Sequence, residues 1–194
     1  MERIRIRELE LLFTPSGIEG RKGAFQHFFS YQRGALFPFF TLLILAGREK
    51  EEKRVLQIIE SYDLPVIREV ISVVSKAMDW KKFQQFPQLK LVYSAKPQDV
   101  ILTSLKDGLR AMSPSSQAVI LFLANKPLIS IESLEKLIRS SLKEKRDILV
   151  PVVKGELSHP IIIPRETAVQ MLKIRKEMGI PYFIKRWRKE VPCD

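Results

Sequence analysis

Cysteine is nearly absent from this sequence. The single residue, Cys193, lies next to the carboxyl-terminal Asp194. One cysteine can form neither a disulfide framework nor a cysteine metal site within one chain, and this usage favours a reducing compartment. The amino-terminal residues alternate basic and apolar side chains and lack the uninterrupted apolar core of a signal peptide. We therefore expect a cytoplasmic protein.

Long hydrophobic runs are also lacking. The most apolar stretch, residues 35–46, contains about a dozen residues, whereas roughly 20 are needed to span a bilayer. Pro38 also interrupts this stretch. The sequence therefore predicts a core helix at residues 35–46 and no association with a membrane.

No internal repeat, low-complexity tract or linker divides the 194 residues. This length suits one domain with one substantial core, and the apolar and charged contents of 45% and 28% are typical of globular proteins. We therefore expect a single domain over residues 1–194.

Acidic side chains are in the minority. The chain has 33 lysine and arginine residues against 22 aspartate and glutamate residues, which gives a net charge of +11. Such an excess favours polyanionic partners, namely nucleoside triphosphates, nucleic acid or an acidic protein surface. It is also compatible with a role in solubility alone.

Short apolar runs alternate with amphipathic segments along the chain. Runs that predict strands occupy residues 8–13, 70–74, 89–93, 118–123, 148–152 and 160–163. A predicted helix begins at residue 24, and others occupy residues 48–60, 78–86, 100–112, 131–144 and 165–177. Strands separated by helices of this length form βαβ units, so we expect an α/β domain with a mainly parallel sheet.

The run at residues 118–123, AVILFL, is apolar throughout, which is typical of a strand buried on both faces of a parallel sheet. It ends at a polar loop, residues 124–127. In open α/β sheets ligands bind just outside the carboxyl ends of the strands, so this loop is expected at a functional site. Asn125 within it is also suited to satisfying the backbone groups of a turn.

The loop after the first predicted strand contains a glycine-rich pattern. Gly17, Arg21 and Gly23 are spaced G-x-x-x-R-x-G before a predicted helix. Glycines let backbone amides approach a phosphate closely, and an arginine can fork onto phosphate oxygens. The same pattern also fits an ordinary strand-to-helix turn with a solvated Arg21.

Four segments, taken in chain order, carry a resemblance to a known family: residues 11–26 (LLFTPSGIEGRKGAFQ), 103–109 (TSLKDGL), 125–127 (NKP) and 158–163 (SHPIII). They resemble the motifs L-x-x-G-x-S-x-R-M-G-x-x-K, S-S-L-x-x-G-L, D-x-P and G-H-P-x-x-[FI] of the MobA-like NTP transferases. Members of this family attach CMP or GMP to molybdopterin. The resemblance implies a three-layer, Rossmann-like α/β fold of the nucleotide-diphospho-sugar transferase type, with a mainly parallel mixed sheet.

The resemblance also implies roles for individual residues. It places the triphosphate against Arg21, Lys22 and the amides of Gly17 and Gly23, and the base against Thr103 and Ser104. It assigns Mg²⁺ to Asn125, the second substrate to Ser158, His159 and Pro160, and catalysis to Arg21, Asn125 and His159. CTP or GTP and molybdopterin are the implied ligands, and a molybdenum enzyme is an implied partner. Without the resemblance, His159 is an ordinary polar residue at the start of a strand.

Several departures from the family pattern bear on catalysis. Asn125 replaces the family aspartate, and its amide offers a neutral oxygen where Mg²⁺ prefers a charged one. Gln26 replaces the loop lysine and Glu19 the loop serine, and of the family's acidic carboxyl-terminal segment only Asp194 remains. We therefore predict a divergent nucleotidyltransferase with reduced or lost catalysis. The alternative is a non-catalytic nucleotide-binding or assembly factor for a molybdenum enzyme.

Nucleic-acid binding is a further alternative. The segment around Trp187 contains Lys185, Arg186, Arg188 and Lys189, which suits phosphate contacts combined with an aromatic stack. The same pattern is typical of the solvated face of an amphipathic helix, and this is the interpretation that we favour.

Overall fold

The computed structural model describes residues 39–46, 51–74, 80–83, 86, 89–94, 101–174 and 179–193. The chain divides into two compact units, Met1–Pro38 and Phe39–Asp194, and the described residues all belong to the second. The strands are β1 (Phe40–Leu45), β2 (Ile67–Val74), β3 (Leu89–Tyr93), β4 (Ala118–Leu123), β5 (Ile148–Val153), β6 (Glu156–Leu157), β7 (Ile161–Pro164) and β8 (Arg188–Cys193). The helices are α3 (Glu52–Ser61), α4 (Ile101–Ala111), α5 (Ile131–Ser141), α6 (Arg165–Met171) and α7 (Gly179–Trp187), with a 3-10 helix at Trp80–Phe83.

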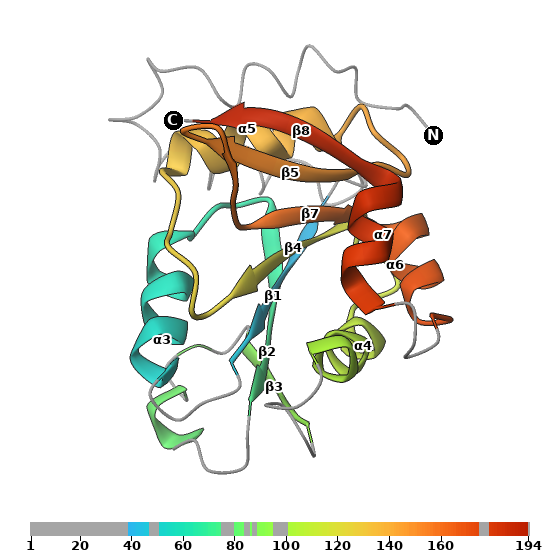
Figure 1. Cartoon of the computed structure of the whole chain (residues 1–194). Coiled ribbons are helices and arrows are strands. Elements are labelled where there is room, and N and C mark those ends of the chain that lie inside the picture. The colour runs from blue at the N-terminus through green and yellow to red at the C-terminus, as the bar shows by residue number, and fades with distance from the viewer. Residues whose placement is uncertain are drawn as a thin grey trace, which may run out of the picture. The chain divides into compact units, whose positions relative to one another are not determined.

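The eight strands form one mixed sheet in the order β3-β2-β1-β4-β7-β5-β6, with β8 beside β5. Strands β3, β2, β1 and β4 are parallel to one another, whereas β7 runs antiparallel to both β4 and β5. Helices α3 and α5 pack on one face of the sheet, and α4, α6 and α7 pack on the other (Figure 1). The predicted three-layer, mainly parallel α/β fold is therefore confirmed.

The strand β1 corrects one prediction. We predicted a helix at residues 35–46, but Phe40–Leu45 is a strand at the centre of the sheet. All six of its residues are buried because helices cover both faces. A short run that is apolar at every position carries no periodicity, so a buried strand and a buried helix look alike in the sequence.

Helix α4 packs unusually close to the sheet at Gly108. A β-carbon added there would lie 2.4 Å from Leu43 Cδ1 on β1 and 3.0 Å from Val73 Cγ2 on β2. A larger residue at this position would therefore require the buried Leu43 side chain to shift. Ser104, one turn before Gly108, is also buried on this helix.

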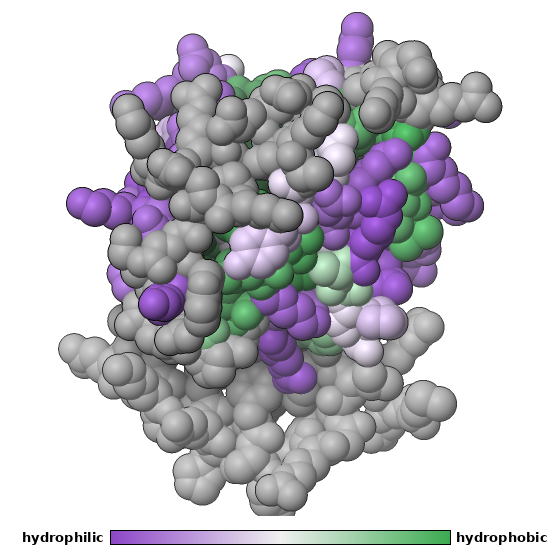
Figure 2. All heavy atoms as spheres, turned by 90° about the horizontal axis from the view of Figure 1, so that it is seen from below, coloured by the Kyte–Doolittle hydropathy of each residue, from purple (hydrophilic) through white to green (hydrophobic). Residues whose placement is uncertain are grey.

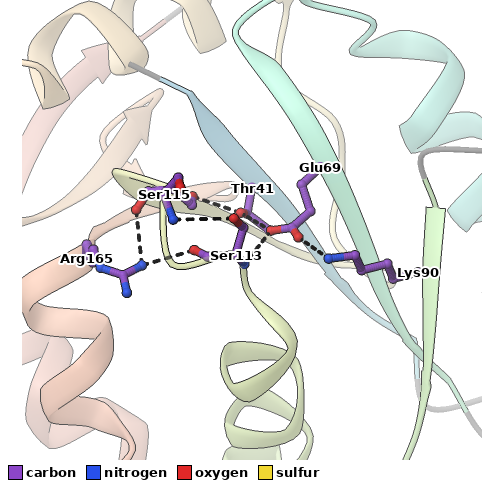
Figure 3. A network of polar contacts seen from close by, with 7 residues as sticks. Thr41, Glu69, Lys90, Ser113, Ser115 and Arg165 are labelled. Atoms are coloured by element: carbon purple, nitrogen blue, oxygen red, sulfur yellow. Dashed lines mark hydrogen bonds and ion pairs between the residues drawn. The ribbon is translucent and has the colours of Figure 1, made fainter. Parts of the chain in front are cut away.

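The amino ends of the parallel strands are joined by a network of polar contacts (Figure 3). The carboxylate of Glu69 on β2 accepts hydrogen bonds from Thr41 Oγ1 at 2.6 Å and from the Ser113 backbone N–H at 2.9 Å. Lys90 Nζ on β3 lies 2.5 Å from the other carboxylate oxygen. Arg165 donates to the Ser113 carbonyl at 3.1 Å, which extends the network to α6.

The pKa of Glu69 results from two opposing effects. Burial of the carboxyl group raises the pKa, but the hydrogen bonds from Lys90, Ser113 and Thr41 outweigh burial and lower it below the usual value. Glu69 is therefore an ionised, fully paired group that ties three strands and the α4–β4 loop together at the end of the sheet opposite to the expected ligand site.

Candidate functional site

The parallel strands all end at one edge of the sheet. Strands β1, β2 and β4 run toward the bottom of Figure 1, and Figure 2 looks onto this end of the molecule, where hydrophilic residues adjoin an apolar patch. In open α/β sheets this is the edge at which ligands bind. Its polar side chains therefore define the candidate site.

The loop after β4 presents Asn125 to solvent. Backbone hydrogen bonds hold this loop, from the Ala124 N–H to the Leu45 carbonyl of β1 (3.0 Å) and from the Lys126 N–H to the Leu123 carbonyl (2.9 Å). The turn is thus closed by backbone groups. Within the described part of the chain the Asn125 side chain has no hydrogen-bond partner, so its amide is available to a ligand.

Arg54, in the first turn of α3, reaches the same loop. Its Nη2 donates to the Lys126 carbonyl at 2.9 Å, and its Nη1 donates to Gln57 Oε1 at 2.6 Å. The sequence did not identify Arg54, because the predicted helix at residues 35–46 left the following segment without the strand-to-helix loop that positions it. The available signal was Gly47, directly after an apolar run and followed by a charged segment, residues 48–54, that contains both basic and acidic residues.

His159 lies on the other side of β4. The antiparallel register runs from Ala118 opposite Pro164 to Leu121 opposite Ile161, and it continues toward His159 beside the end of β4. The ring is largely buried, and its Nδ1 has no hydrogen-bond partner within the described residues. Burial lowers the pKa of His159 and the positive charge of Lys126 lowers it further, although a hydrogen bond to the Leu121 backbone opposes them. The structure thus brings Asn125, Lys126, Arg54 and His159 to one edge, with His159 neutral at pH 7.

The lowered pKa of His159 makes stability depend on pH. The unfolded chain takes up a proton near pH 6.5 and the folded protein only at lower pH, so the free energy of unfolding falls as the pH drops below about 6.5. We expect His159→Gln to reduce this slope in urea unfolding between pH 7.5 and 5. The matched control is His27→Gln, since the chain has two histidines. A slope that His27→Gln removes and His159→Gln leaves intact would contradict the assignment.

Ser158 and Pro160 flank His159 on the connection to β7. The Ser158 N–H donates to the Pro151 carbonyl at 2.8 Å, Pro160 is buried, and the bond between His159 and Pro160 is cis. These contacts hold the histidine backbone in place beside β4.

Thr103 and Ser104 lie in the first turn of α4. Ser104 is buried at 3% exposure, and its hydroxyl has no hydrogen-bond partner in the part of the chain that the structure describes. Thr103 is half-buried. A buried hydroxyl without a partner is costly unless a ligand or water satisfies it, so Ser104 is suited to a ligand contact.

Gly17, Arg21, Lys22 and Gly23 lie outside the described residues. The predicted role of these four residues in triphosphate binding therefore stays a prediction.

The charged side chains at the loop that contains Asn125 are cationic. Asn125 offers only a neutral amide oxygen, and its loop holds the Lys126 ammonium and accepts a hydrogen bond from the Arg54 guanidinium, whereas the carboxylates of Glu51 and Glu52 stand at the start of α3. Two cations raise the electrostatic cost of binding Mg²⁺ beside them. Among the described residues no group of three or more histidine, cysteine, aspartate and glutamate side chains is arranged to hold a metal ion.

None of the described helices has the length and apolarity needed to cross a membrane.

The sequence model of the MobA-like NTP transferase domain matches residues 42–191. The chain belongs to the MobA-like NTP transferase family. The match begins within β1, and residues 17–23 precede it. Members of this family use nucleoside triphosphates as substrates. Among curated proteins no significant match is found.

Solved structures support the fold of this MobA-like domain. Rv0371c from Mycobacterium tuberculosis H37Rv is 14% identical, with a TM-score of 0.65 over 82% of this chain and 90% of that one. A complex of Rv0371c with manganese gives a TM-score of 0.62 at 14% identity, over 81% and 89% of the two chains. The 4-diphosphocytidyl-2C-methyl-D-erythritol synthase of Anaerococcus prevotii gives 0.60 at 15% identity, over 81% and 88%. At these identities the likeness shows the fold alone.

Proposed function

We propose that this protein binds CTP or GTP at the carboxyl ends of β1 and β4, and that it transfers nucleotide slowly or not at all. The observation that carries the proposal is the position of Asn125. It stands in the loop where the family pattern has the metal-binding aspartate, with its amide facing solvent beside two cationic side chains. The exposed position at the carboxyl end of β4 is where a nucleotide would bind, whereas the neutral amide oxygen of Asn125 is a poor ligand for Mg²⁺.

The proposed roles of the other residues follow the family pattern. Thr103 and Ser104 contact the base, and the buried Ser104 hydroxyl supports this role because it lacks another partner among the described residues. Ser158, His159 and Pro160 face the second substrate, and a neutral imidazole can donate to or accept from it. Gly17, Arg21, Lys22 and Gly23 precede the residues that the family model matches, so their contact with the triphosphate stays a prediction from the sequence.

The second substrate in this proposal is molybdopterin, the acceptor that the family resemblance implies. A protein that binds nucleotide without efficient transfer would instead act in the cytoplasm as an assembly factor for a molybdenum enzyme. In the transferase, Arg21 and His159 act on the reacting groups. In both cases Asn125 coordinates Mg²⁺ weakly at most, and the nucleotide is recognised through its base.

The test is calorimetric titration of the full chain with CTP, GTP and ATP at moderate salt, followed by assay of pyrophosphate release with molybdopterin. We expect base-selective binding of CTP or GTP with little pyrophosphate release. No binding of any of the three nucleotides would overturn the proposal. Binding of nucleic acid that weakens steeply with salt, without base preference, would instead favour a nucleic-acid-binding role.

A further inference from the structure

Arg54 lies at the edge of the sheet where the parallel strands end. It lies in the first turn of α3, which follows the loop after β1, and β1 is the neighbour of β4 in the sheet. Its hydrogen bond of 2.9 Å to the Lys126 carbonyl fixes the guanidinium between these two strand ends. The guanidinium is therefore held at the ligand-binding edge by the loop that also contains Asn125.

The positive charge of Arg54 is not neutralised within the described part of the chain. Both groups that accept its hydrogen bonds, Gln57 Oε1 and the Lys126 carbonyl, are uncharged. No carboxylate lies within ion-pair distance of it among the described residues. A guanidinium has five N–H donors, so donors remain for the paired oxygens of a phosphate.

Lys126 adds a second positive charge beside Arg54. Its side chain is exposed and forms no ion pair among the described residues, and its charge is felt at the buried ring of His159. Together the two side chains supply two positive charges at an edge where Asn125 supplies none of the negative charge that a divalent cation needs.

We infer that Arg54 and Lys126 take over the charge-neutralising role of the divalent cation, so that this protein binds the nucleoside triphosphate in its metal-free form. The inference rests on the proposed function. It adds Arg54 as the residue that binds the phosphates, and it names the ionic form of the ligand. Since Mg²⁺ removes two negative charges from a triphosphate, free CTP or GTP should bind at least as tightly as its Mg²⁺ complex.

The experiment is calorimetric titration of the full chain with CTP and GTP, once in excess Mg²⁺ and once in excess EDTA. We expect the affinity in EDTA to equal or exceed that in Mg²⁺. Arg54→Gln should weaken binding in EDTA roughly 10- to 100-fold, the loss expected for a charge-assisted hydrogen-bond pair. Arg54→Lys, which keeps the charge without the forked geometry, should recover part of that loss.

The matched control is Arg110→Gln, which removes the same charge from an exposed arginine in the last turn of α4. It should bind nucleotide like the wild type, and urea unfolding of each variant checks that it is folded. In the wild type, Arg54 donates only to uncharged groups, so we expect Arg54→Gln to cause no large loss of stability.

Three outcomes separate the claims. If the wild type binds neither CTP nor GTP under either condition, the proposed function fails. If it binds only in Mg²⁺, the proposed function stands and the metal-free inference is overturned. If it binds in EDTA and Arg21→Gln rather than Arg54→Gln weakens binding, the assignment of the phosphates to Arg54 is overturned.

Discussion

Replacing Asn125 with aspartate is expected to make nucleotide binding by this protein dependent on Mg²⁺. The side chain is exposed at the carboxyl end of β4 and has no hydrogen-bond partner among the described residues, so the substitution changes charge without breaking a contact. A carboxylate is the ligand that Mg²⁺ prefers, and it would also offset the positive charge of Lys126 and Arg54. In the Asn125→Asp variant, we expect Mg²⁺ to increase the affinity for CTP or GTP at least about tenfold, since even residues that contact a metal only through its ligands contribute that much.

The same substitution should accelerate any pyrophosphate release, because a bound metal stabilises charge on the leaving pyrophosphate. The measurements are calorimetric titration with and without Mg²⁺ and a pyrophosphate-release assay. The matched control is Gln117→Glu, which adds the same charge to an exposed amide residue immediately before β4, at its opposite end. If Asn125→Asp leaves both metal affinity and turnover unchanged, Asn125 does not stand at the metal position.

Replacing Glu69 with alanine is expected to lower the free energy of unfolding by about 3 kcal/mol. Glu69 is 6% exposed and accepts hydrogen bonds from Thr41 and from the Ser113 backbone, and both donors would lose this charged acceptor. The pair with Lys90 adds less, because the Lys90 side chain is 55% exposed and water screens its charge. Urea unfolding at pH 7 measures the loss.

Glu166→Ala is the control for this prediction. Glu166 forms an ion pair with Arg146 at 3.3 Å, but the two side chains are 56% and 66% exposed, so its removal should cost less than about 1 kcal/mol. Equal effects of the two substitutions would contradict the importance assigned to the buried network.

The Glu69 contribution also has a defined pH dependence. The pKa of Glu69 in the folded protein is below the unfolded value of about 4.5. The stabilisation from its charge is therefore complete above about pH 4.5, and it is lost as the pH falls through the pKa of the folded protein. The stability difference between the wild type and Glu69→Gln should therefore shrink in acid. A difference that stays constant from pH 7 to pH 3 would show that ionisation of Glu69 contributes little.

Local sequence patterns were sufficient to predict most of the helices and strands. The strand at Ala118–Leu123 was predicted with its observed bounds, and the helix predicted at residues 131–144 is observed as Ile131–Ser141. A buried parallel strand and an amphipathic helix both have their signature within a dozen residues. The strands β6 and β8 were missed. β6 has only two residues, both exposed, and four of the six residues of β8 are exposed, so neither shows the apolar pattern of a core strand.

Only some residues of the candidate site could be predicted from the sequence. Asn125, Ser104 and His159 were named from ordered motifs, and the structure places Asn125 just after β4 and His159 just before β7, the antiparallel neighbour of β4. Arg54 was not named, because its position depends on β1 being a strand and on β1 lying beside β4. Contacts between residues 54 and 126 are set by the order of strands in the sheet, which no local pattern contains.

The sequence by itself determined the fold class, the family and the identity of the residues at the end of β4. Alternating hydrophobic periods and ordered motifs are properties of short segments, so they can be recognised without knowledge of the fold. Only the tertiary structure decided that residues 40–45 form the central strand, that Glu69 is paired on all sides, and that Arg54 reaches the loop after β4. These features depend on burial and on contacts between distant segments, which exist only once the sheet has assembled its strands in one order.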